Sequence, residues 1–195
     1  MPVLGMDTSN FTGPLTAENA TQLRNSMGID RAIIATTFPD SYASQLQACK
    51  QAGMYCEAYI YLNNVNGKYY SGKDYAQQAL DAANIVKQDV TRLWIDLEDV
   101  TGQLPTEADI LGALESVQSA GLAVGIYTAS WYWSQIGNPQ LGYLAPLWNA
   151  NYDKSYDGAN TFSVWYGGWT MALVKQYDAG VQQYGLNLDL DVWRV

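Results

Sequence analysis

The chain contains no histidine, and only two of its 195 residues are cysteine. The absence of histidine excludes a Ser-His-Asp or Cys-His catalytic site, and it excludes every zinc site that needs a histidine ligand. Two cysteines are also too few to hold zinc by themselves. Any catalytic chemistry is therefore left to carboxylates, hydroxyls, amides and aromatic side chains.

Charged residues are scarce as well: they make up 15% of the chain, and 10 Lys+Arg stand against 19 Asp+Glu, for a net charge of −9. The excess of negative charge repels nucleic acid and anionic membrane surfaces, so we expect neither as a partner. Long apolar runs are missing too, and we expect no transmembrane helix. The segment from Met1 to Gly5 lacks the basic and apolar regions of a signal peptide. Either the protein is not exported by a signal peptide, or the peptide was removed before this sequence begins.

Aromatic residues, in contrast, are abundant, and the 15 Tyr and 7 Trp far outnumber the 3 Phe. Tyr and Trp combine a flat apolar face with a polar edge, which suits them to stacking on sugar rings. A Tyr-rich core and surface would explain the composition equally well. The two cysteines, Cys49 and Cys56, also leave two alternatives open: a disulfide between a helix and the next strand, or two buried free thiols.

Short β-rich segments alternate with helical segments over the first two thirds of the chain. The expected strands cover residues 3–8, 31–36, 54–62, 93–98 and 122–128, and the expected helices cover 16–27, 41–52, 74–87 and 106–120. Three further strands, at 146–151, 173–177 and 188–192, follow in a looser pattern rich in Gly and Tyr. Alternation of this kind is typical of βαβ units in a parallel sheet.

The eight expected strands favour a closed barrel. We predict an α/β fold in which residues 1–195 form one catalytic domain, a single small parallel (β/α)8-type barrel that is irregular in its C-terminal third. The alternative is an open α/β sheet. Such sheets usually carry a glycine-rich cofactor motif after the first strand, and this chain has none.

The fourth expected strand places acidic residues on one face. Side chains alternate across a strand, so Trp94, Asp96 and Glu98 share one face, whereas the apolar residues between them share the other. The apolar face should pack on helices, which turns the acids toward the barrel axis near the C-terminal end of the strand, where barrel enzymes place their sites. Two residues apart, Asp96 and Glu98 lie roughly 7 Å apart at Cα. Each should raise the pKa of the other, which helps to keep one protonated as a general acid.

Acids on two other strands strengthen this prediction. Asp7 ends the first strand, and Asp189 and Asp191 lie in the last strand, which neighbours the first in a closed barrel. Carboxylates from three strands would then meet at one rim, with no basic residue beside them on those strand ends. Such a cluster suits glycoside hydrolysis or a hard-metal site with oxygen ligands. Four tryptophans lie on or just after neighbouring strands and favour a sugar-binding cleft over a metal site: Trp94, Trp131, Trp133 and Trp148.

The order and spacing of several motifs resemble the family 25 glycoside hydrolases, the lysozymes of the Chalaropsis type. The similarity spans nearly the whole chain and includes the Asp-x-Glu pair of residues 94–98 (Trp-Ile-Asp-Leu-Glu) and the first-strand motif of residues 5–13 (Gly-Met-Asp-Thr-Ser-Asn-Phe-Thr-Gly). Other matching segments are residues 31–36, 47–61, 122–128, 146–152, 176–177 and 188–190. The family 18 chitinases are less similar, because their strand carries a further Asp at the position of Trp94.

The resemblance implies a retaining hydrolase that cuts the β-1,4 bond between N-acetylmuramic acid and N-acetylglucosamine in peptidoglycan, with no metal and no cofactor. It implies that Glu98 is the general acid and base, and that Asp96 is the nucleophile or orients the acetamido group of the substrate. Asp7 and Asp189 would support the developing charge. The residues implied for substrate binding are Tyr59, Tyr61, Trp94, Tyr127, Trp148, Gln176 and Asp191.

The chain also departs from the family pattern. Ile60 stands where the family commonly has His, Lys175 where a Trp often occurs, and Asp191 where Asn is usual. Glu57 is an extra acid without an assigned role. Two alternatives therefore stay open: a carbohydrate-binding barrel without catalysis, and a related hydrolase of another glycan, which the acidic charge favours. We expect a secreted or extracellular monomer whose partner is a polysaccharide.

Overall fold

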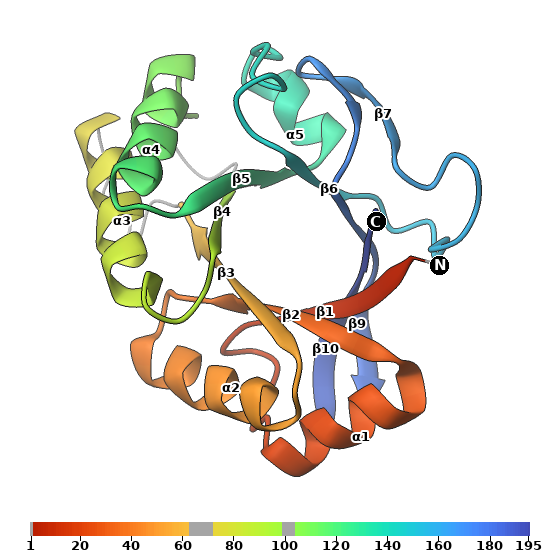
Figure 1. Cartoon of the computed structure of the whole chain (residues 1–195). Coiled ribbons are helices and arrows are strands. Elements are labelled where there is room, and N and C mark those ends of the chain that lie inside the picture. Colours follow the sequence, from red (N-terminus) through yellow and green to blue (C-terminus); the bar gives the residue numbers. More distant parts are fainter. Residues whose placement is uncertain (1, 63–71, 99–103) are drawn as a thin grey trace.

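The computed structural model describes residues 2–62, 72–98 and 104–195. Within them, eight strands close a barrel in the order β1-β10-β9-β6-β5-β4-β3-β2 (Figure 1). The strands are β1 (Val3–Thr8), β2 (Ile29–Ala35), β3 (Tyr55–Tyr61), β4 (Arg92–Asp96), β5 (Ala123–Thr128), β6 (Leu147–Ala150), β9 (Val174–Gln183) and β10 (Leu186–Trp193). This closed barrel of mixed α/β architecture confirms the predicted fold class.

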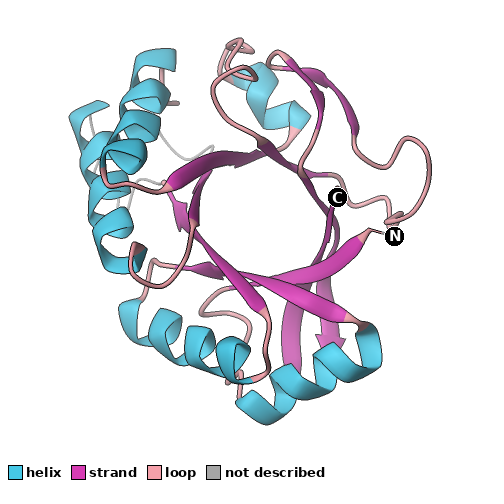
Figure 2. Cartoon of the chain, in the orientation of Figure 1, coloured by secondary structure: helices cyan, strands magenta, loops and turns pink. Residues whose placement is uncertain are grey.

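Helices connect the first five strands, as the alternating pattern predicts. They are α1 (Ala17–Met27), α2 (Pro39–Gln51), α3 (Gly72–Val86) and α4 (Glu107–Ser119), and a short α5 (Ser130–Gln135) follows β5. Two of the starts are set by side-chain caps: Thr16 accepts the backbone N–H of Asn19, and Thr106 forms a reciprocal capping box with Asp109. Figure 2 shows these helices around the outside of the strands. None of the helices in the described ranges is both long and apolar enough to cross a membrane.

One strand departs from the predicted parallel barrel, because β10 runs antiparallel to both of its neighbours, β1 and β9. The residues between β9 and β10 are Tyr184 and Gly185, and both have positive φ, 49° and 75°. A two-residue turn of this kind produces a hairpin, whereas a parallel pair needs a crossover of a dozen or more residues. The remaining neighbours in the barrel are parallel.

The C-terminal third is irregular, as expected, but it contains a hairpin that the sequence pattern does not predict. Along the chain, strands β7 (Ser163–Tyr166) and β8 (Trp169–Met171) come after β6 and before β9. They form a two-stranded sheet that is separate from the barrel. Trp169 of this hairpin packs against Trp133 of α5, with ring centroids 5.0 Å apart. The hairpin and α5 thus cover the barrel where a regular fold would place further helices (Figure 1).

The barrel has an inner apolar cluster that is distinct from the layer between strands and helices. Its buried members are Ile33, Trp94, Tyr127, Trp148, Val174 and Trp193. Two glycines make room for the indoles: a Cβ at Gly5 would lie 2.1 Å from Trp193, and one at Gly125 would lie 2.3 Å from Trp94. The floor of the barrel is therefore filled by large rings, and the polar site lies above it.

The two cysteines are buried free thiols, and no disulfide joins them in the structure. Cys49 lies near the end of α2 and Cys56 near the start of β3, as the pattern predicts.

Candidate active site

Asp7 and Asp189 face each other between β1 and β10. The antiparallel register pairs them directly, and Asp7 is buried while Asp189 is partly exposed. Because β10 runs against β1, the early part of β10 lies beside the C-terminal end of β1. Asp189 therefore reaches the predicted rim, but it does so through the hairpin and not as the end of a parallel strand.

Asp96 and Glu98 reach the same rim from β4. Asp96 is the last residue of that strand and is buried, and its register partners are Tyr61 on β3 and Tyr127 on β5. Glu98 follows two residues later and is partly exposed. The predicted alternation holds, because Trp94 belongs to the inner cluster of the barrel and its two neighbours in β4 belong to the outer core.

The electrostatic surroundings of Tyr59 show how closely the four acids gather. Burial raises the pKa of the Tyr59 hydroxyl well above its usual range, and the carboxylates of Asp7, Asp96, Glu98 and Asp189 all raise this pKa further. A negative charge raises the pKa of a nearby hydroxyl because the phenolate would be repelled. Since one hydroxyl is affected by acids from β1, β4 and β10, these acids surround a common space.

The pKa of Asp7 is raised more strongly than that of Asp189. Burial raises its pKa well above the usual range, and the charges of Asp189 and Glu98 add to the increase, against hydrogen bonds from Gln176 and Asp191. Burial also raises the pKa of Asp189. Both shifts follow from holding like charges together away from water. The cluster therefore retains protons at a pH where isolated aspartates have lost them.

Gln176 connects the acids to two tyrosines. Its side-chain N–H donates to Asp7 Oδ2 over 2.6 Å and to Asp189 Oδ2 over 3.4 Å. Its carbonyl oxygen accepts the hydroxyls of Tyr127, over 2.7 Å, and Tyr152, over 2.9 Å. The amide is therefore held from both sides, and we assign it a role in fixing the orientation of Asp7.

Two indoles below the acids differ from the prediction. Trp94 and Trp148 are implied by the resemblance as substrate-binding residues, but both are fully buried, and their rings pack edge to face 5.8 Å apart. Trp94 donates its N–H to Glu57 Oε2 over 2.7 Å, and Trp148 donates to Asp191 Oδ1 over 2.7 Å. A sugar cannot stack on a ring that packing covers on all sides, so these indoles support the site from below.

Two further acids lie away from the surface. Asp191 has no exposed surface, so it makes no direct contact with a substrate in this structure. Glu57 is also buried, and Arg92 forms an ion pair with it over 3.2 Å. Glu57 therefore serves the packing of the barrel floor, which accounts for the acid without an assigned role.

A recess of about 230 Å³ opens beside the acids. Asp7, Asp189 and Tyr59 contribute to its wall, together with four residues that the sequence analysis does not select: Ser9, Phe11, Thr12 and Asn187. Phe11 is the notable member, because 79% of its surface is exposed next to a polar site. In the sequence, the feature that could have pointed to Phe11 is an aromatic residue three positions after the end of β1.

Lys175, a departure from the family pattern, is buried on the outer side of the barrel wall. Its ammonium donates to Asp153 Oδ1 over 2.6 Å and to the carbonyl of Ser155 over 2.8 Å. The segment that it holds carries Tyr152, whose hydroxyl bonds to Gln176. Lys175 therefore fixes one edge of the site without entering it.

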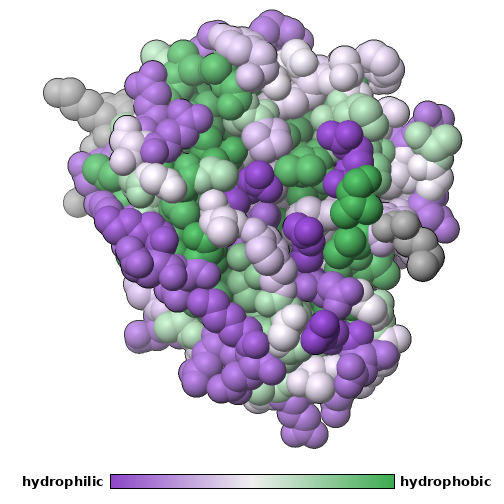
Figure 3. Space-filling view, in the orientation of Figure 1, coloured by the Kyte–Doolittle hydropathy of each residue, from purple (hydrophilic) through white to green (hydrophobic). Residues whose placement is uncertain are grey.

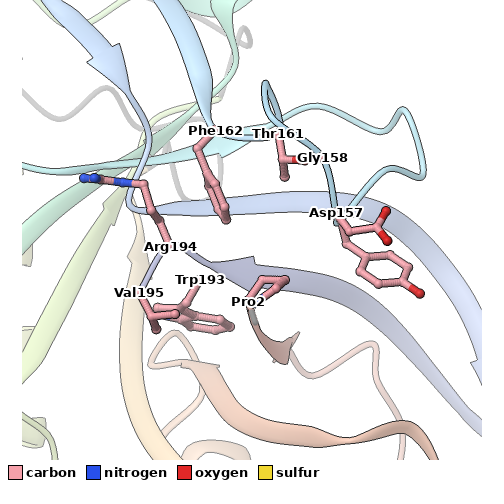
Figure 4. Close-up of a pocket in the computed structure, with 9 residues that line it drawn as sticks. Pro2, Asp157, Gly158, Thr161, Phe162, Trp193, Arg194 and Val195 are labelled. Carbon is pink, nitrogen blue, oxygen red and sulfur yellow. The ribbon is translucent and has the colours of Figure 1, made fainter.

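A second recess, of about 250 Å³, lies at the other end of β1, between the two ends of the described chain (Figure 4). Asp157 is the one acidic side chain among the described residues that line it, and the Arg194 side chain donates to the Ala172 carbonyl. Figure 3 shows that apolar and hydrophilic side chains alternate over the face seen in Figure 1. The second recess therefore does not bring acids together as the recess beside Asp7 and Asp189 does.

The described acids do not form a metal centre. In the part of the chain that the structure describes, no group of three or more His, Cys, Asp or Glu side chains is placed to hold a metal ion. Among the same residues, no ion pair reaches Asp7 or Asp189. The two carboxylates instead accept hydrogen bonds, both of them from Gln176 and Asp189 also from the backbone N–H of Gly180.

The family model described as Lys-1, lysozyme-like protein 1, matches residues 3–177. Counting factor 50 of Dictyostelium discoideum is 29% identical over 162 residues, which cover 80% of this chain and 54% of that protein. Probable GH family 25 lysozyme 3 of the same organism is 28% identical over 203 residues, 96% of this chain and 40% of that protein.

The solved structure of a muramidase from Acremonium alcalophilum matches with a TM-score of 0.70 and 16% identity, over 99% of this chain and 94% of that one. This likeness supports the fold. The chain spans about half the length of the curated relatives named above, 54% and 40%.

Proposed function

Because this chain belongs to the lysozyme-like family related to the family 25 glycoside hydrolases, we propose that it is a retaining glycosidase. Its substrate in this proposal is peptidoglycan, cut at the β-1,4 bond between N-acetylmuramic acid and N-acetylglucosamine. The observation that carries the proposal is the meeting of Asp7, Asp96, Glu98 and Asp189 around Tyr59 at one rim of the barrel. Paired carboxylates at an open rim suit the cleavage of a glycosidic bond.

In this mechanism Glu98 donates a proton to the glycosidic oxygen as the bond to the leaving sugar breaks. Its partial exposure allows contact with a bound glycan. Asp96 attacks the anomeric carbon, or orients the acetamido group that attacks in its place. Glu98 then removes a proton from the water that completes hydrolysis, which returns both carboxyls to their starting states.

Retaining enzymes hold the two carboxyl groups about 5 Å apart, closer than inverting enzymes do. Asp96 ends β4, Glu98 follows two residues later, and the charges of both act on the Tyr59 hydroxyl, which supports retention. Asp7 and Asp189 lie across the rim from them. A carboxylate there stabilises the positive charge that develops on the sugar ring.

The substrate contacts that we propose come from the recess and the tyrosines above the floor. The Phe11 ring offers an exposed apolar face, and the partly exposed Tyr59 and Tyr61 offer polar contacts near the acids, whereas Tyr127 is buried and holds Gln176. Sugar recognition commonly combines stacking with hydroxyl and amide hydrogen bonds. Gln176 contributes by holding Tyr127 and Asp7 in place.

A glycan other than peptidoglycan is the second candidate. The net charge of −9 favours it, since an anionic cell wall would be repelled at low ionic strength. A binding barrel without catalysis would keep the recess but give no products. In each case we propose that the protein acts as a monomer outside the cell, where such polysaccharides occur.

The test is the clearing of a suspension of purified cell walls, followed by release of reducing ends. Wild type should clear it, and Glu98→Gln should not, while Glu115→Gln removes an exposed carboxylate on α4 as a matched control. The anomeric form of the first product, observed by NMR, tests retention. Failure on peptidoglycan with activity on another glycan would support the second candidate, whereas binding without products from any glycan would contradict the enzyme.

A further inference from the structure

Asp191 is a carboxyl group that the proposed mechanism does not use. It lies inside the barrel on β10 with none of its surface exposed. Its register partner on β1 is Gly5, and Asp7 lies two residues further along β1. The Asp191 carboxyl is in hydrogen-bond contact with that of Asp7.

The hydrogen bonds of Asp191 are consistent with only one of its two protonation states. Trp148 donates its indole N–H to Asp191 Oδ1 over 2.7 Å. The other oxygen, Oδ2, is buried and no N–H or O–H group of the described residues donates to it. An ionised carboxylate in this position would leave Oδ2 without a donor and would face a second carboxylate. Buried acceptors without donors are rare and costly.

The surrounding charges make ionisation of Asp191 more costly. Asp7 faces it from β1, and Asp189 lies on its own strand. The cations on neighbouring strands point elsewhere: Lys175 to Asp153, and Arg31 over the rings of Tyr55 and Trp193. The remaining neighbours from β6 and β9 are Trp148, which donates to it, and the neutral Gln176 and Tyr177.

We propose that Asp191 carries a proton and donates it in a hydrogen bond to the carboxylate of Asp7, so that it positions Asp7 without adding a second negative charge. Asp191 Oδ1 is then the carbonyl oxygen that accepts from Trp148, and Oδ2 is the hydroxyl. Asp7 receives two donors, this O–H and the amide N–H of Gln176 over 2.6 Å. Two donors stabilise a carboxylate, so Asp7 is the ionised member of the pair.

The assignment deepens the proposed function by giving Asp191 a role as a positioning residue. It also agrees with the direction of the pKa shifts, because burial and the charge of Asp7 raise the pKa of Asp191 well above its usual range. On Asp7 the hydrogen bonds from Asp191 and Gln176 act in the opposite direction and offset part of the rise in pKa that burial and the charge of Asp189 cause. The proton therefore lies on the deeper acid, and the negative charge lies nearer to the recess.

Infrared difference spectroscopy tests the proton directly and needs no substrate. At neutral pH, wild type should show the C=O stretch of a protonated carboxylic acid that is absent from Asp191→Asn. The amide keeps both hydrogen bonds, since its oxygen accepts from Trp148 and its N–H donates to Asp7. Glu115→Gln, the surface control, should keep the band. A band that persists unchanged in Asp191→Asn would show that the proton resides elsewhere and would overturn the proposal.

The pH dependence of thermal stability is the second measurement. An acid whose pKa is raised on folding costs stability as pH rises from its unfolded value, about 3.9, toward its folded value. Asp191→Asn removes this cost, so its Tm relative to wild type should increase as pH rises above about 4. The corresponding difference for Glu115→Gln should stay constant. A constant difference for Asp191→Asn would mean that Asp191 ionises normally and would contradict the proposal.

A third comparison separates positioning from packing. Asp191→Leu keeps the volume but loses the donor, and we expect its hydrolytic rate to fall roughly tenfold or more below that of Asp191→Asn. Equal rates in the two variants would remove the positioning role. If Asp191→Leu does not fold, the infrared band of wild type and Asp191→Asn still decides the protonation state. If no glycan is cleaved at all, the proposed function fails while the proton assignment is tested independently.

Discussion

Gln176 on β9 donates its amide N–H to Asp7 on β1 across 2.6 Å, although β10 lies between their strands. The same N–H group also lies 3.4 Å from Asp189 Oδ2, so one amide contacts both acids of the β1–β10 pair. Because Tyr127 and Tyr152 both donate to the other end of the amide, the side chain has one favourable orientation.

Replacing Gln176 by Glu should therefore remove the donor and add a negative charge beside Asp7 and Asp189. We expect a loss of about 1–3 kcal/mol in the free energy of unfolding and a fall of roughly tenfold or more in rate. Chemical denaturation and a reducing-end assay measure the two effects. Gln118→Glu adds the same charge on the exposed face of α4 and should change neither quantity much. Native-like stability and rate in Gln176→Glu would argue against the bridging role.

Glu98→Gln should abolish hydrolysis and leave the fold intact. The amide keeps the shape of the side chain but cannot donate a proton to the leaving oxygen, and general acid–base catalysis is worth about 10²–10⁴ in rate. Turnover on cell walls, together with the Tm, measures both parts of the prediction. Near-native turnover of Glu98→Gln on a substrate that wild type cleaves would remove Glu98 from the mechanism.

The rate should follow a bell-shaped pH profile with its optimum on the acidic side of neutral. Asp96 and Glu98 work as one protonated and one ionised carboxyl, and no imidazole is present to account for either limb. Asp96→Asn removes a negative charge next to Glu98, so Glu98 should lose its proton at lower pH and the alkaline limb should move down. The residual activity of the variant, followed across pH, checks this. An alkaline limb that does not move would mean that the two acids are not coupled.

Chelation should leave activity unchanged. Hydrolysis by two carboxylates requires no metal ion, whereas a cluster of oxygen ligands could bind one if the chemistry depended on it. The measurement is the rate before and after dialysis against EDTA. Complete loss of activity that a single added cation restores would favour a metal-dependent reaction instead.

Gly125→Ala should destabilise the barrel, because the added methyl would lie 2.3 Å from the Trp94 ring in a closed core. Overpacking of this kind costs about 1–3 kcal/mol. Gly112→Ala is the matched control: it lies within α4, and its Cβ would lie 3.5 Å from the Cβ of Ala76, an ordinary contact. A helix favours Ala over Gly by about 1 kcal/mol, so the control should gain stability. Chemical denaturation of both variants gives the comparison, and a Gly125→Ala variant as stable as wild type would contradict it.

Much of the architecture follows from local patterns. Alternation along the expected strand of residues 93–98 assigns Asp96 and Glu98 to one face, since side chains of a strand point to opposite sides in turn. The capping residues Thr16 and Thr106 mark where helices begin, because their side chains satisfy backbone N–H groups within the same few residues. Both properties depend on near neighbours in the chain. The sequence by itself therefore determines a barrel with acids at one rim.

Other features depend on contacts between distant residues, and only the tertiary structure decides them. The composition marks Trp94 and Trp148 as suited to sugar, but the closed barrel covers them. The reversed direction of β10 brings Asp189 to Asp7 and buries Asp191 beneath it. The protonation of a carboxyl depends on how far it is removed from water and which groups face it. Both are set by the register between strands that lie far apart in sequence, and periodicity within a strand contains no information about that register.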